Sequence, residues 1–300
     1  MRVAVCIVGY RSDEDVARCL VALDASDHAD LEVVVCENGG EAAFAALQTR
    51  IADGPKLRVP LRLLSADNPG FAGGVNLCMD AAPDADAWWV LNPDTVPEPQ
   101  ALSALVARLA VGDCGAVGGP VLLAADKVQS WGGIWETWLA RAVSLGYGAP
   151  PAAEPPAADI EARQTYLNGA SMLVGRALVE RVGRMREDYF LYCEEVEWCL
   201  RAGRAGLKLG YAPQGRVLHF QGSTTGHSAS VRDRSALSVR LNERNRLLLT
   251  RDLYAARLPV VAVLALLVFV WRYGRARAWP QLAAAFTGWR QGLANVRGPR

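Results

Sequence analysis

The first third of the chain alternates between short apolar runs and segments whose apolar residues have helical spacing. The four apolar runs are Val3–Val8, Leu31–Cys36, Leu61–Leu64 and Trp88–Leu91. The four segments with helical spacing are Asp13–Leu23, Ala42–Ile51, Phe71–Ala82 and Pro99–Leu109. Strands that are apolar throughout and separated by helices are typical of a parallel sheet with helices on both faces. The alternation therefore predicts an α/β fold.

The fourth apolar run ends abruptly at Asn92, Pro93 and Asp94. Proline cannot continue a central strand, so the strand is expected to stop here and to present Asp94 at its carboxyl end. Ligands of open α/β sheets bind at this edge. No lysine or arginine lies near Asp94 in the sequence, so its carboxylate suits a divalent metal that holds a diphosphate. The alternative is a strand followed by a turn and a helix cap, because Asp94 and Thr95 both cap helices well.

The second half of the chain has a less regular pattern of predicted elements. The predicted β segments are Gly115–Leu123, Lys127–Trp135, Thr165–Val174, Tyr189–Cys193, Leu207–Ala212 and Val217–Phe220. Helices are predicted over Arg176–Val182, Glu194–Ala205 and Leu237–Leu253, and a proline- and alanine-rich surface loop over Ala149–Ala158. We expect one domain over residues 1–250, divided into halves at 1–112 and 113–250, and a helical segment over 251–300.

The composition is that of a globular protein with ample core, because 51% of the 300 residues are hydrophobic and 21% are charged. The net charge of +1 provides no basic field for nucleic acid, so nucleic acid is not an expected partner. Seven cysteines without a C-x-x-C pair indicate a reducing, cytoplasmic compartment. The apolar N-terminal run is too short for a signal peptide and is expected to be the first strand.

The stretch Leu258–Trp271 is uniformly apolar and lies between Arg257 and Arg272. It is shorter than the roughly 17 residues that a membrane-spanning helix needs. Tryptophans beside arginines suit a membrane interface, so we favour peripheral attachment to the cytoplasmic membrane surface. The alternative is a C-terminal helical hairpin, formed with the weaker apolar stretch Trp279–Trp289, that packs on the domain.

Polar and glycine-rich stretches follow the first three predicted strands. Tyr10 comes after the first strand and can stack on a base, and Glu37 ends the second strand, where an acid can bind ribose hydroxyls. A solvated turn is the alternative for Glu37. The glycine-rich stretch after the third strand lets backbone approach a ligand closely. Its candidate donor-binding residues are Asp67, Asn68, Gly73 and Asn76.

A second acidic cluster, Glu194, Glu195 and Glu197, opens a predicted helix. The helix dipole favours acids there, and Glu197 can pair with Arg201 one turn later. Because Glu195 points about 100° away from the other two, one carboxylate can face a cleft as a general base while the others cap and pair. His219 ends a short apolar strand; a lone histidine is usually structural, but its imidazole can also join a carboxylate as a metal ligand.

These motifs together resemble the inverting family-two glycosyltransferases of the GT-A fold, and among them bacterial rhamnosyltransferase-like enzymes. The resemblance covers about residues 1–250. It rests on Asn92–Thr95 as a variant of the D-x-D motif, on Asn68–Asn76, on Tyr189–Glu197, and on His219 with Arg244–Arg246. It implies a nucleotide-sugar-binding half over 1–112 and an acceptor-binding half over 113–250.

The resemblance also implies a role for particular side chains. Asp94 and His219 would bind Mg²⁺ or Mn²⁺, Glu195 would be the catalytic base, and Asp67 would contact the pyrimidine. Asn92 replaces the first acid of the usual motif, so its contact to the donor would be neutral. Glu195, like Glu37, stands where many relatives carry aspartate.

The implied reaction moves a sugar from a dTDP- or UDP-sugar, with dTDP-rhamnose as the first candidate, to a glycan or lipid-linked acceptor in cell wall or polysaccharide biosynthesis. Candidate acceptor-binding residues are Glu194, Trp131, Trp135, Trp138, Arg244 and Arg246. Burial is the alternative for the tryptophans, and a solvated helix face for the arginines.

Two other functions remain open at this point: a non-catalytic nucleotide-sugar or glycan-binding domain of the same fold, and a nucleotidyltransferase. The latter would need a basic phosphate-binding loop near the first strand, where only Arg11 is available. The absence of a G-x-G-x-x-G fingerprint argues against a dinucleotide oxidoreductase.

Overall fold

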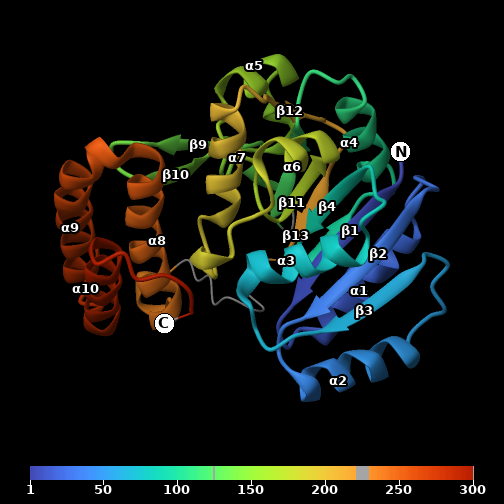
Figure 1. Cartoon of the computed structure of the whole chain (residues 1–300), viewed down its shortest axis with the longest axis horizontal. Helices are drawn as coiled ribbons and strands as arrows, with labels where there is room; N and C mark the ends of the chain where they lie inside the picture. Colours follow the sequence, from blue (N-terminus) through green and yellow to red (C-terminus); the bar gives the residue numbers. More distant parts are fainter. Residues whose placement is uncertain (124–125, 221–229, 300) are drawn as a thin grey trace.

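A computed structural model describes residues 1–123, 126–220 and 230–299, and its centre is a seven-stranded sheet (Figure 1). The strands of this sheet are β1 (Val3–Gly9), β2 (Leu31–Glu37), β3 (Leu61–Ser65), β4 (Ala87–Leu91), β6 (Ala116–Gly118), β11 (Ser171–Gly175) and β12 (Leu209–Tyr211). Their order is β12-β6-β11-β4-β1-β2-β3, and β11 alone runs antiparallel to its neighbours. The predicted mostly parallel sheet is confirmed.

Helices cover both faces of this sheet. The α-helices are α1 (Asp13–Asp24), α2 (Glu41–Ala52), α3 (Gly70–Ala81), α4 (Ala101–Leu109), α5 (Ala157–Arg163), α6 (Arg176–Val182), α7 (Glu194–Arg204), α8 (Ala236–Tyr254), α9 (Leu258–Arg275) and α10 (Trp279–Leu293). Single 3₁₀ turns lie at Pro151–Ala153, Glu187–Tyr189, Val231–Asp233 and Ala255–Arg257. Alternate residues of β1 point to opposite faces: Ile7 packs with α1 and α4, whereas Cys6 packs with α3. A strand buried on both faces must be apolar throughout, as β1 is.

A second, four-stranded sheet stands beside the carboxyl end of β4. Its strands, in the order β5-β13-β7-β8, are β5 (Thr95–Pro97), β13 (Val217–His219), β7 (Val121–Leu123) and β8 (Lys127–Ser130). The predicted segment Gly115–Leu123 is therefore two strands in two sheets, because the chain turns at Gly119 and Pro120. The segment Lys127–Trp135 also divides, and its second part, β9 (Gly133–Glu136), forms a hairpin with β10 (Arg141–Ser144).

Two other predictions for the second half are wrong in detail. The surface loop predicted over Ala149–Ala158 contains a 3₁₀ turn and the start of α5. The segment Tyr189–Cys193 is not a strand, because Phe190, Tyr192 and Cys193 have positive φ angles of 68°, 74° and 71°. Such angles lie in the left-handed region, which no strand contains.

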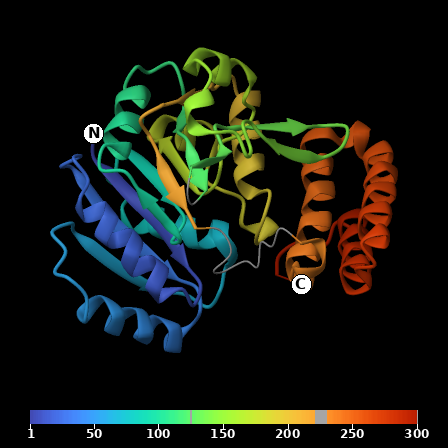
Figure 2. The same ribbon diagram turned by 180° about the vertical axis from the view of Figure 1, so that it is seen from behind.

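The helices α8, α9 and α10 pack against one another at one end of the molecule (Figures 1 and 2). Gly288 and Gly292 of α10 let that helix approach α8 closely: a Cβ on Gly288 would lie 2.0 Å from the carbonyl oxygen of Arg240. The helical hairpin expected as an alternative is thus present. The helical stretch 236–275 is also long and apolar enough to cross a membrane by length and composition alone, with a mean hydropathy of 2.4 over its most apolar window.

Candidate functional site

A cleft of about 390 Å³ opens at the carboxyl ends of β1, β2 and β4. Its polar lining residues are Tyr10, Asn38, Asn68, Asn92, Asp94, Gln129, Asn168, Tyr192, Glu194, Glu195, His219, Ser235 and Ser238. A second cavity, of about 580 Å³ and lined by Arg108 and Glu161 among others, contains none of the predicted site residues. The chemistry therefore points to the first cleft.

Strand pairing places His219 beside Asp94. In the second sheet β13 runs antiparallel to β5, so that His219 pairs with Thr95, and the N–H of Phe220 donates to the carbonyl oxygen of Asp94 at 2.9 Å. The Thr95 hydroxyl donates to the carbonyl oxygen of Asn92 at 2.7 Å and fixes the turn at Pro93. As a result, His219 Nε2 lies 3.1 Å from Asp94 Oδ1, although 125 residues separate them.

Gln129 orients the histidine. His219 Nδ1 lies 2.7 Å from Gln129 Oε1, an atom that can only accept, so Nδ1 carries the hydrogen. On the neutral ring the Nε2 lone pair then faces Asp94 and Asn92, whereas on the protonated ring Nε2–H donates to Asp94. Gln129 was not among the predicted site residues, because it meets His219 only across β7, the strand that lies between β8 and β13 in the second sheet.

Asp94 is almost fully buried, with 7% of its surface exposed. Burial raises the pKa of a carboxyl, but the hydrogen bond and the charge of His219 outweigh that effect and hold the pKa of Asp94 below its usual value. Two electron-rich atoms at 3.1 Å require a proton or a cation between them. A carboxylate oxygen and an imidazole nitrogen aimed at one point fit a divalent cation. Among the described residues, no group of three or more His, Cys, Asp or Glu side chains could hold a metal ion.

The two carboxyls that open α7 also reach the cleft. Glu194 is 2% exposed, and burial, followed by the charge of Glu195, raises the pKa of Glu194 to about 8. Glu195 is half-buried, and burial raises the pKa of Glu195 above the usual 4.5. Its side chain faces the loop at Gly169, where an added Cβ would lie 3.3 Å from Glu195 Cγ. The third acid, Glu197, instead pairs with Arg201 at 2.9 Å, as predicted for an i,i+4 pair.

The segment Tyr189–Cys193, which leads into α7, is held from outside by α8. Asn245 Nδ2 donates to the carbonyl oxygens of Tyr189, Leu191 and Tyr192 at 2.8–3.0 Å. The positive φ angles of the segment Tyr189–Cys193 cost about 1–2 kcal/mol each, and the hydrogen bonds from Asn245 offset that cost. Asn245 is fully buried, so it acts on the site only through this segment.

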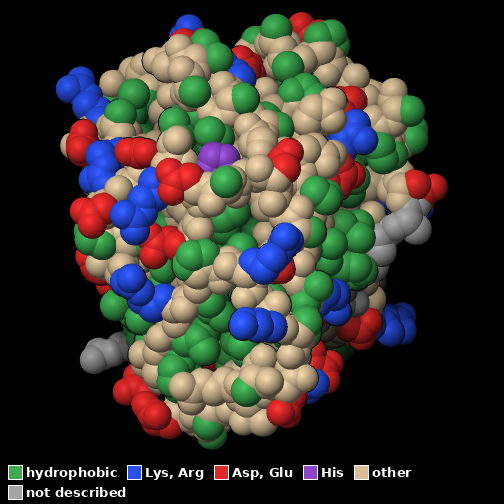
Figure 3. All heavy atoms as spheres, turned by 90° about the vertical axis from the view of Figure 1, so that its right-hand side faces the viewer, with side chains coloured by type: hydrophobic (Ala, Val, Ile, Leu, Met, Phe, Trp, Pro, Cys, Tyr) green, Lys and Arg blue, Asp and Glu red, His purple; other side chains and the backbone are tan. Residues whose placement is uncertain are grey.

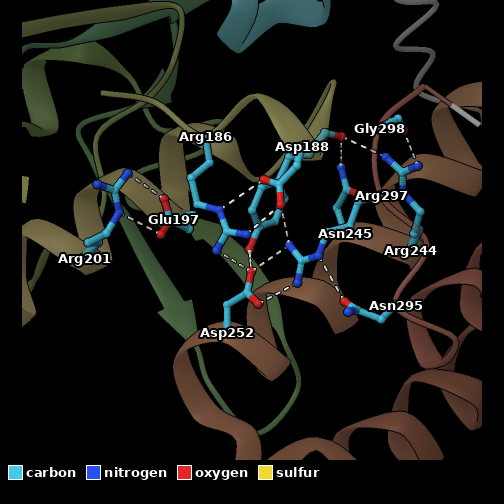
Figure 4. A network of polar contacts seen from close by, with 11 residues as sticks. Arg186, Asp188, Glu197, Arg201, Arg244, Asn245, Asp252, Asn295, Arg297 and Gly298 are labelled. Atoms are coloured by element: carbon cyan, nitrogen blue, oxygen red, sulfur yellow. Dashed lines mark hydrogen bonds and ion pairs between the residues drawn. The ribbon is translucent and has the colours of Figure 1, made fainter. Parts of the chain in front are cut away.

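An ion-pair network also braces the start of this segment (Figure 4). Arg186 and Arg297 both pair with Asp188 and with Asp252, at N–O distances of 2.6–2.8 Å. The Tyr189 hydroxyl also donates to Asp252, at 2.8 Å. Residues from α8 and from the stretch after α10 therefore fix the approach to Glu195.

The predicted nucleotide-side residues divide into two groups. Tyr10, Asn68 and Asn92 line the cleft, but Asp67 is exposed outside its lining. Glu37 is completely buried: its Oε1 accepts from the backbone N–H groups of Arg11 and Gly39, both at 2.8 Å. The solvated-turn alternative for Glu37 is therefore wrong. Its Oε2 has no hydrogen-bond partner among the described residues, and contact with a ribose stays a prediction.

Two predicted donor-binding residues have structural roles instead. Asn76 Nδ2 donates to the carbonyl oxygen of Met185 at 2.9 Å and to Glu187 at 2.8 Å, on the side of α3 away from the cleft lining. Gly73 packs against Pro69, where a Cβ would lie 2.6 Å from the proline ring. Neither residue lines the cleft, so the structure does not support donor contact for either.

Three predicted acceptor residues are likewise committed elsewhere. Trp131 is 5% exposed and lies in a core cluster, so it offers no stacking surface. Arg244 is fully buried and donates to the carbonyl oxygens of Tyr189 and Gly298, which corrects both the acceptor role and the solvated alternative. Arg246 donates to the carbonyls of Leu139 and Ala140 and pairs with Glu243. The other two tryptophans differ: Trp135 is buried, whereas Trp138 is 54% exposed.

Replacing Glu194 by glutamine is expected to stabilise the protein at pH 8 more than at pH 5. Between the unfolded pKa of 4.5 and the folded value of about 8, the unfolded chain loses the Glu194 proton and the folded protein keeps it. Stability therefore falls as pH rises through this window, and Glu194→Gln removes the loss, worth ~4 kcal/mol at pH 8. Melting temperatures at the two pH values test this, with exposed Glu180→Gln as the control. An equal effect at both pH values would contradict a protonated Glu194.

Comparison with known proteins gives a consistent result. The model of the family described as Glycosyltransferase like family 2 matches residues 1–246. The hexosyltransferase Agl10 of low-salt glycan biosynthesis in Haloferax volcanii is 25% identical over 138 residues, which cover 44% of this chain and 43% of that protein. The N-acetylglucosaminyl-diphospho-decaprenol L-rhamnosyltransferase of Mycobacterium tuberculosis is 39% identical over 61 residues, 20% of either chain. The matched stretches thus span less than half of these relatives.

The solved structure of the mannosyltransferase PcManGT from Pyrobaculum calidifontis, in complex with GDP-Man and Mn²⁺, superposes on this chain with a TM-score of 0.59. The sequences are 17% identical, and the match covers 98% of this chain and 87% of that chain. The likeness shows a shared fold, and the predicted GT-A fold is confirmed.

Proposed function

Because the chain belongs to the glycosyltransferase family 2 and has the GT-A fold, we propose that it transfers a sugar from a nucleoside diphosphate to an acceptor hydroxyl with inversion at the anomeric carbon. One observation carries this proposal. The same cleft is lined by Asp94 and His219, two side chains of the kinds that bind metals, and by the carboxylate of Glu195. The family membership argues against the nucleotidyltransferase alternative.

Asp94 and His219 would hold a divalent metal, Mg²⁺ or Mn²⁺, through Oδ1 and Nε2. Support comes from their geometry and from a structural relative solved with Mn²⁺ and GDP-Man. A bound metal neutralises the charge that develops on the diphosphate leaving group. Gln129 would keep the Nε2 lone pair of His219 aimed at the metal position. The uncharged amide of Asn92 lies beside His219 Nε2.

Tyr10 and Asn68 would form the nucleotide side of the cleft. Tyr10 lines the cleft and is 39% exposed, so its ring can stack on a base. Asp67 would contact the pyrimidine edge from the cleft margin. The short, 39% identical stretch shared with an L-rhamnosyltransferase favours dTDP-rhamnose over a UDP-sugar as the first donor to test.

Glu195 would act as the base. As the acceptor oxygen bonds to the anomeric carbon and the bond to the diphosphate breaks, the hydroxyl proton moves to a Glu195 carboxylate oxygen. Glu194 is held neutral beside it, so it adds no second negative charge and can donate to a bound sugar. We further propose that the acceptor is a glycan or lipid-linked sugar and that the enzyme works on the cytoplasmic side.

Thermal shift with a panel of nucleotide sugars, each with Mn²⁺ and with EDTA, tests this function. A rise in melting temperature is expected for one diphosphate sugar with Mn²⁺ and not with EDTA. The same donor is then incubated with acceptor sugars, and product is measured by mass spectrometry. Metal-dependent binding without transfer or hydrolysis would favour the non-catalytic alternative, and no binding of any nucleotide sugar would contradict the proposal.

Asn245→Ala is expected to lower kcat by tenfold or more and to change donor affinity by less than about twofold. The substitution removes the N–H groups that hold three carbonyls before α7, so Glu195 loses its position while the donor side of the cleft stays intact. Asn242→Ala on the same helix is the control, because among the described residues Asn242 donates within its own helix, to the Ser238 carbonyl. Equal losses in kcat and donor affinity would indicate general unfolding instead.

A further inference from the structure

Helix α9 has two apolar faces, and only one of them is covered. Its inner face, formed by Val261, Ala262, Ala265, Phe269 and Tyr273, is buried against α8 and α10. Its outer face, formed by Val260, Val263, Leu267, Val270 and Trp271, is exposed. At 100° per residue the two sets lie on opposite sides of the helix. Leu267 and Trp271 are 61% and 64% exposed, so a row of large apolar side chains has no partner within the described chain.

The charge around this face has a single sign. Residues 253–300 contain seven arginines and no aspartate or glutamate. Arg272, Arg275, Arg277 and Arg290 form no salt bridge with any residue that the structure describes. By contrast, acidic and basic side chains mix on the face seen in Figure 3. A basic rim around an apolar face is complementary to a lipid surface with anionic head groups.

Tryptophan–arginine pairs lie at both ends of the outer face. At the start of α9, Arg257 lies 4.6 Å from the ring centroid of Trp138, which the β9–β10 hairpin brings to this helix (Figure 2). Near its end, Arg275 lies 5.6 Å from the ring centroid of Trp271. These two side-chain types are enriched where hydrocarbon meets the head groups, so the pairs suit a helix with both ends at the interface.

The contacts of the inner face favour a helix that lies on a membrane over one that crosses it. Trp289 of α10 donates through Nε1 to the carbonyl oxygen of Ala262 at 2.9 Å, and Phe286 packs edge-on against Phe269 at 5.0 Å. Insertion of α9 would break these contacts. Its apolar run Leu258–Trp271 is also only ~21 Å long at 1.5 Å per residue, against ~30 Å of hydrocarbon.

We propose that the outer face of α9 docks on an anionic lipid bilayer, with the helix axis in the membrane plane. The end of α9 is joined to the cleft margin: Arg232 Nε donates to the carbonyl oxygen of Ala276 at 2.7 Å, and the nearby Ser235 lines the cleft. Docking through this face therefore holds the cleft close to the bilayer. The docking itself does not depend on the proposed glycosyl transfer.

Co-sedimentation of the full chain with vesicles tests the proposal. Wild-type protein is expected to bind phosphatidylcholine vesicles containing 30% phosphatidylglycerol at least tenfold more tightly than vesicles of phosphatidylcholine alone. Val263→Asp with Leu267→Asp should lower the binding tenfold or more. Arg275→Glu with Arg277→Glu should lower it by at least about 25-fold, since each basic residue contributes about fivefold and the new glutamates are repelled.

Matched variants separate docking from general effects. Val111→Asp replaces an exposed valine in the turn after α4. Arg163→Glu with Arg181→Glu reverses the charge of two exposed arginines on α5 and α6. Both control proteins should bind vesicles like wild type. Circular dichroism and donor-induced thermal shifts should be unchanged in every variant, so failure of docking and failure of the proposed function are distinguishable. The proposal is overturned if the α9 variants bind vesicles like wild type. It is also overturned if the protein resists extraction by alkaline carbonate, which indicates spanning, or if the outer face instead forms a dimer that these variants dissociate.

Discussion

Asp94→Ala is expected to abolish metal-dependent donor binding and to reduce transfer by about 10³-fold. Asp94 Oδ1 and His219 Nε2 are the paired donors at the carboxyl end of β4, and removing one leaves a single imidazole to hold the cation. Calorimetric titration of a nucleotide sugar in the presence of Mn²⁺ measures the loss of binding, and a radiolabelled-sugar assay measures the loss of transfer.

The control for this experiment is Asp84→Ala, an exposed aspartate in the turn between α3 and β4, far from the cleft lining. Gln129→Leu adds a graded case. It should weaken metal dependence by about 10- to 100-fold, because the histidine loses the acceptor that fixes its tautomer. Wild-type metal dependence in Asp94→Ala would remove the assignment of this pair and leave the fold unaffected.

Glu195→Gln is expected to lower transfer by about 10²–10⁴-fold while donor affinity stays within about twofold of wild type. The amide keeps the shape of the side chain but cannot accept the acceptor proton. Glu194→Gln is the matched variant, since Glu194 lies one residue away in the same first turn of α7 and already holds its proton near neutral pH. It should retain most of the transfer rate. Turnover lost in Glu194→Gln and kept in Glu195→Gln would exchange the two roles.

The same assignment predicts a pH profile for the wild-type enzyme. Burial raises the pKa of Glu195 above 4.5, so the fraction of ionised base increases with pH through that raised value. The acidic limb of kcat should therefore lie above pH 4.5 and disappear in Glu195→Gln, while donor binding shows no such limb. A limb that persists in the variant would have to come from another group.

Strands β1 and β4 could be predicted from the sequence because both are buried on both faces and therefore apolar throughout. Pro93 fixes the end of β4, and β1 begins and ends within one residue of its predicted bounds. The segment Tyr189–Cys193 defeats the same logic. Its aromatic residues favour a strand locally, but hydrogen bonds from Asn245, more than 50 residues later, impose left-handed angles.

The site shows a similar division. That Asp94, Glu195 and His219 line one cleft could be predicted, because each stands at a strand end or a helix start with few local partners. Arg244 could not be assigned, since an arginine on a long helix gives no local sign that its face is buried and that its partners are backbone carbonyls. Gln129 carries no signal in its own segment, and its role depends on the order of strands in the second sheet.

The contacts between the stretch after α10 and the segment before α7 also affect the order in which the site forms during synthesis. The N–H of Gly298 donates to the carbonyl oxygen of Asp188 at 2.8 Å, and Arg297 pairs with Asp188 and Asp252. Arg297 and Gly298 are synthesised about a hundred positions after Glu195. By then both sheets, with Asp94 and His219, have left the ribosome. A growing chain can thus complete the proposed donor side of the cleft before Glu195, the proposed base, is held in place. We expect nascent chains to bind a nucleotide sugar without transferring the sugar. Sugar transfer should begin only after residue 298 has been translated.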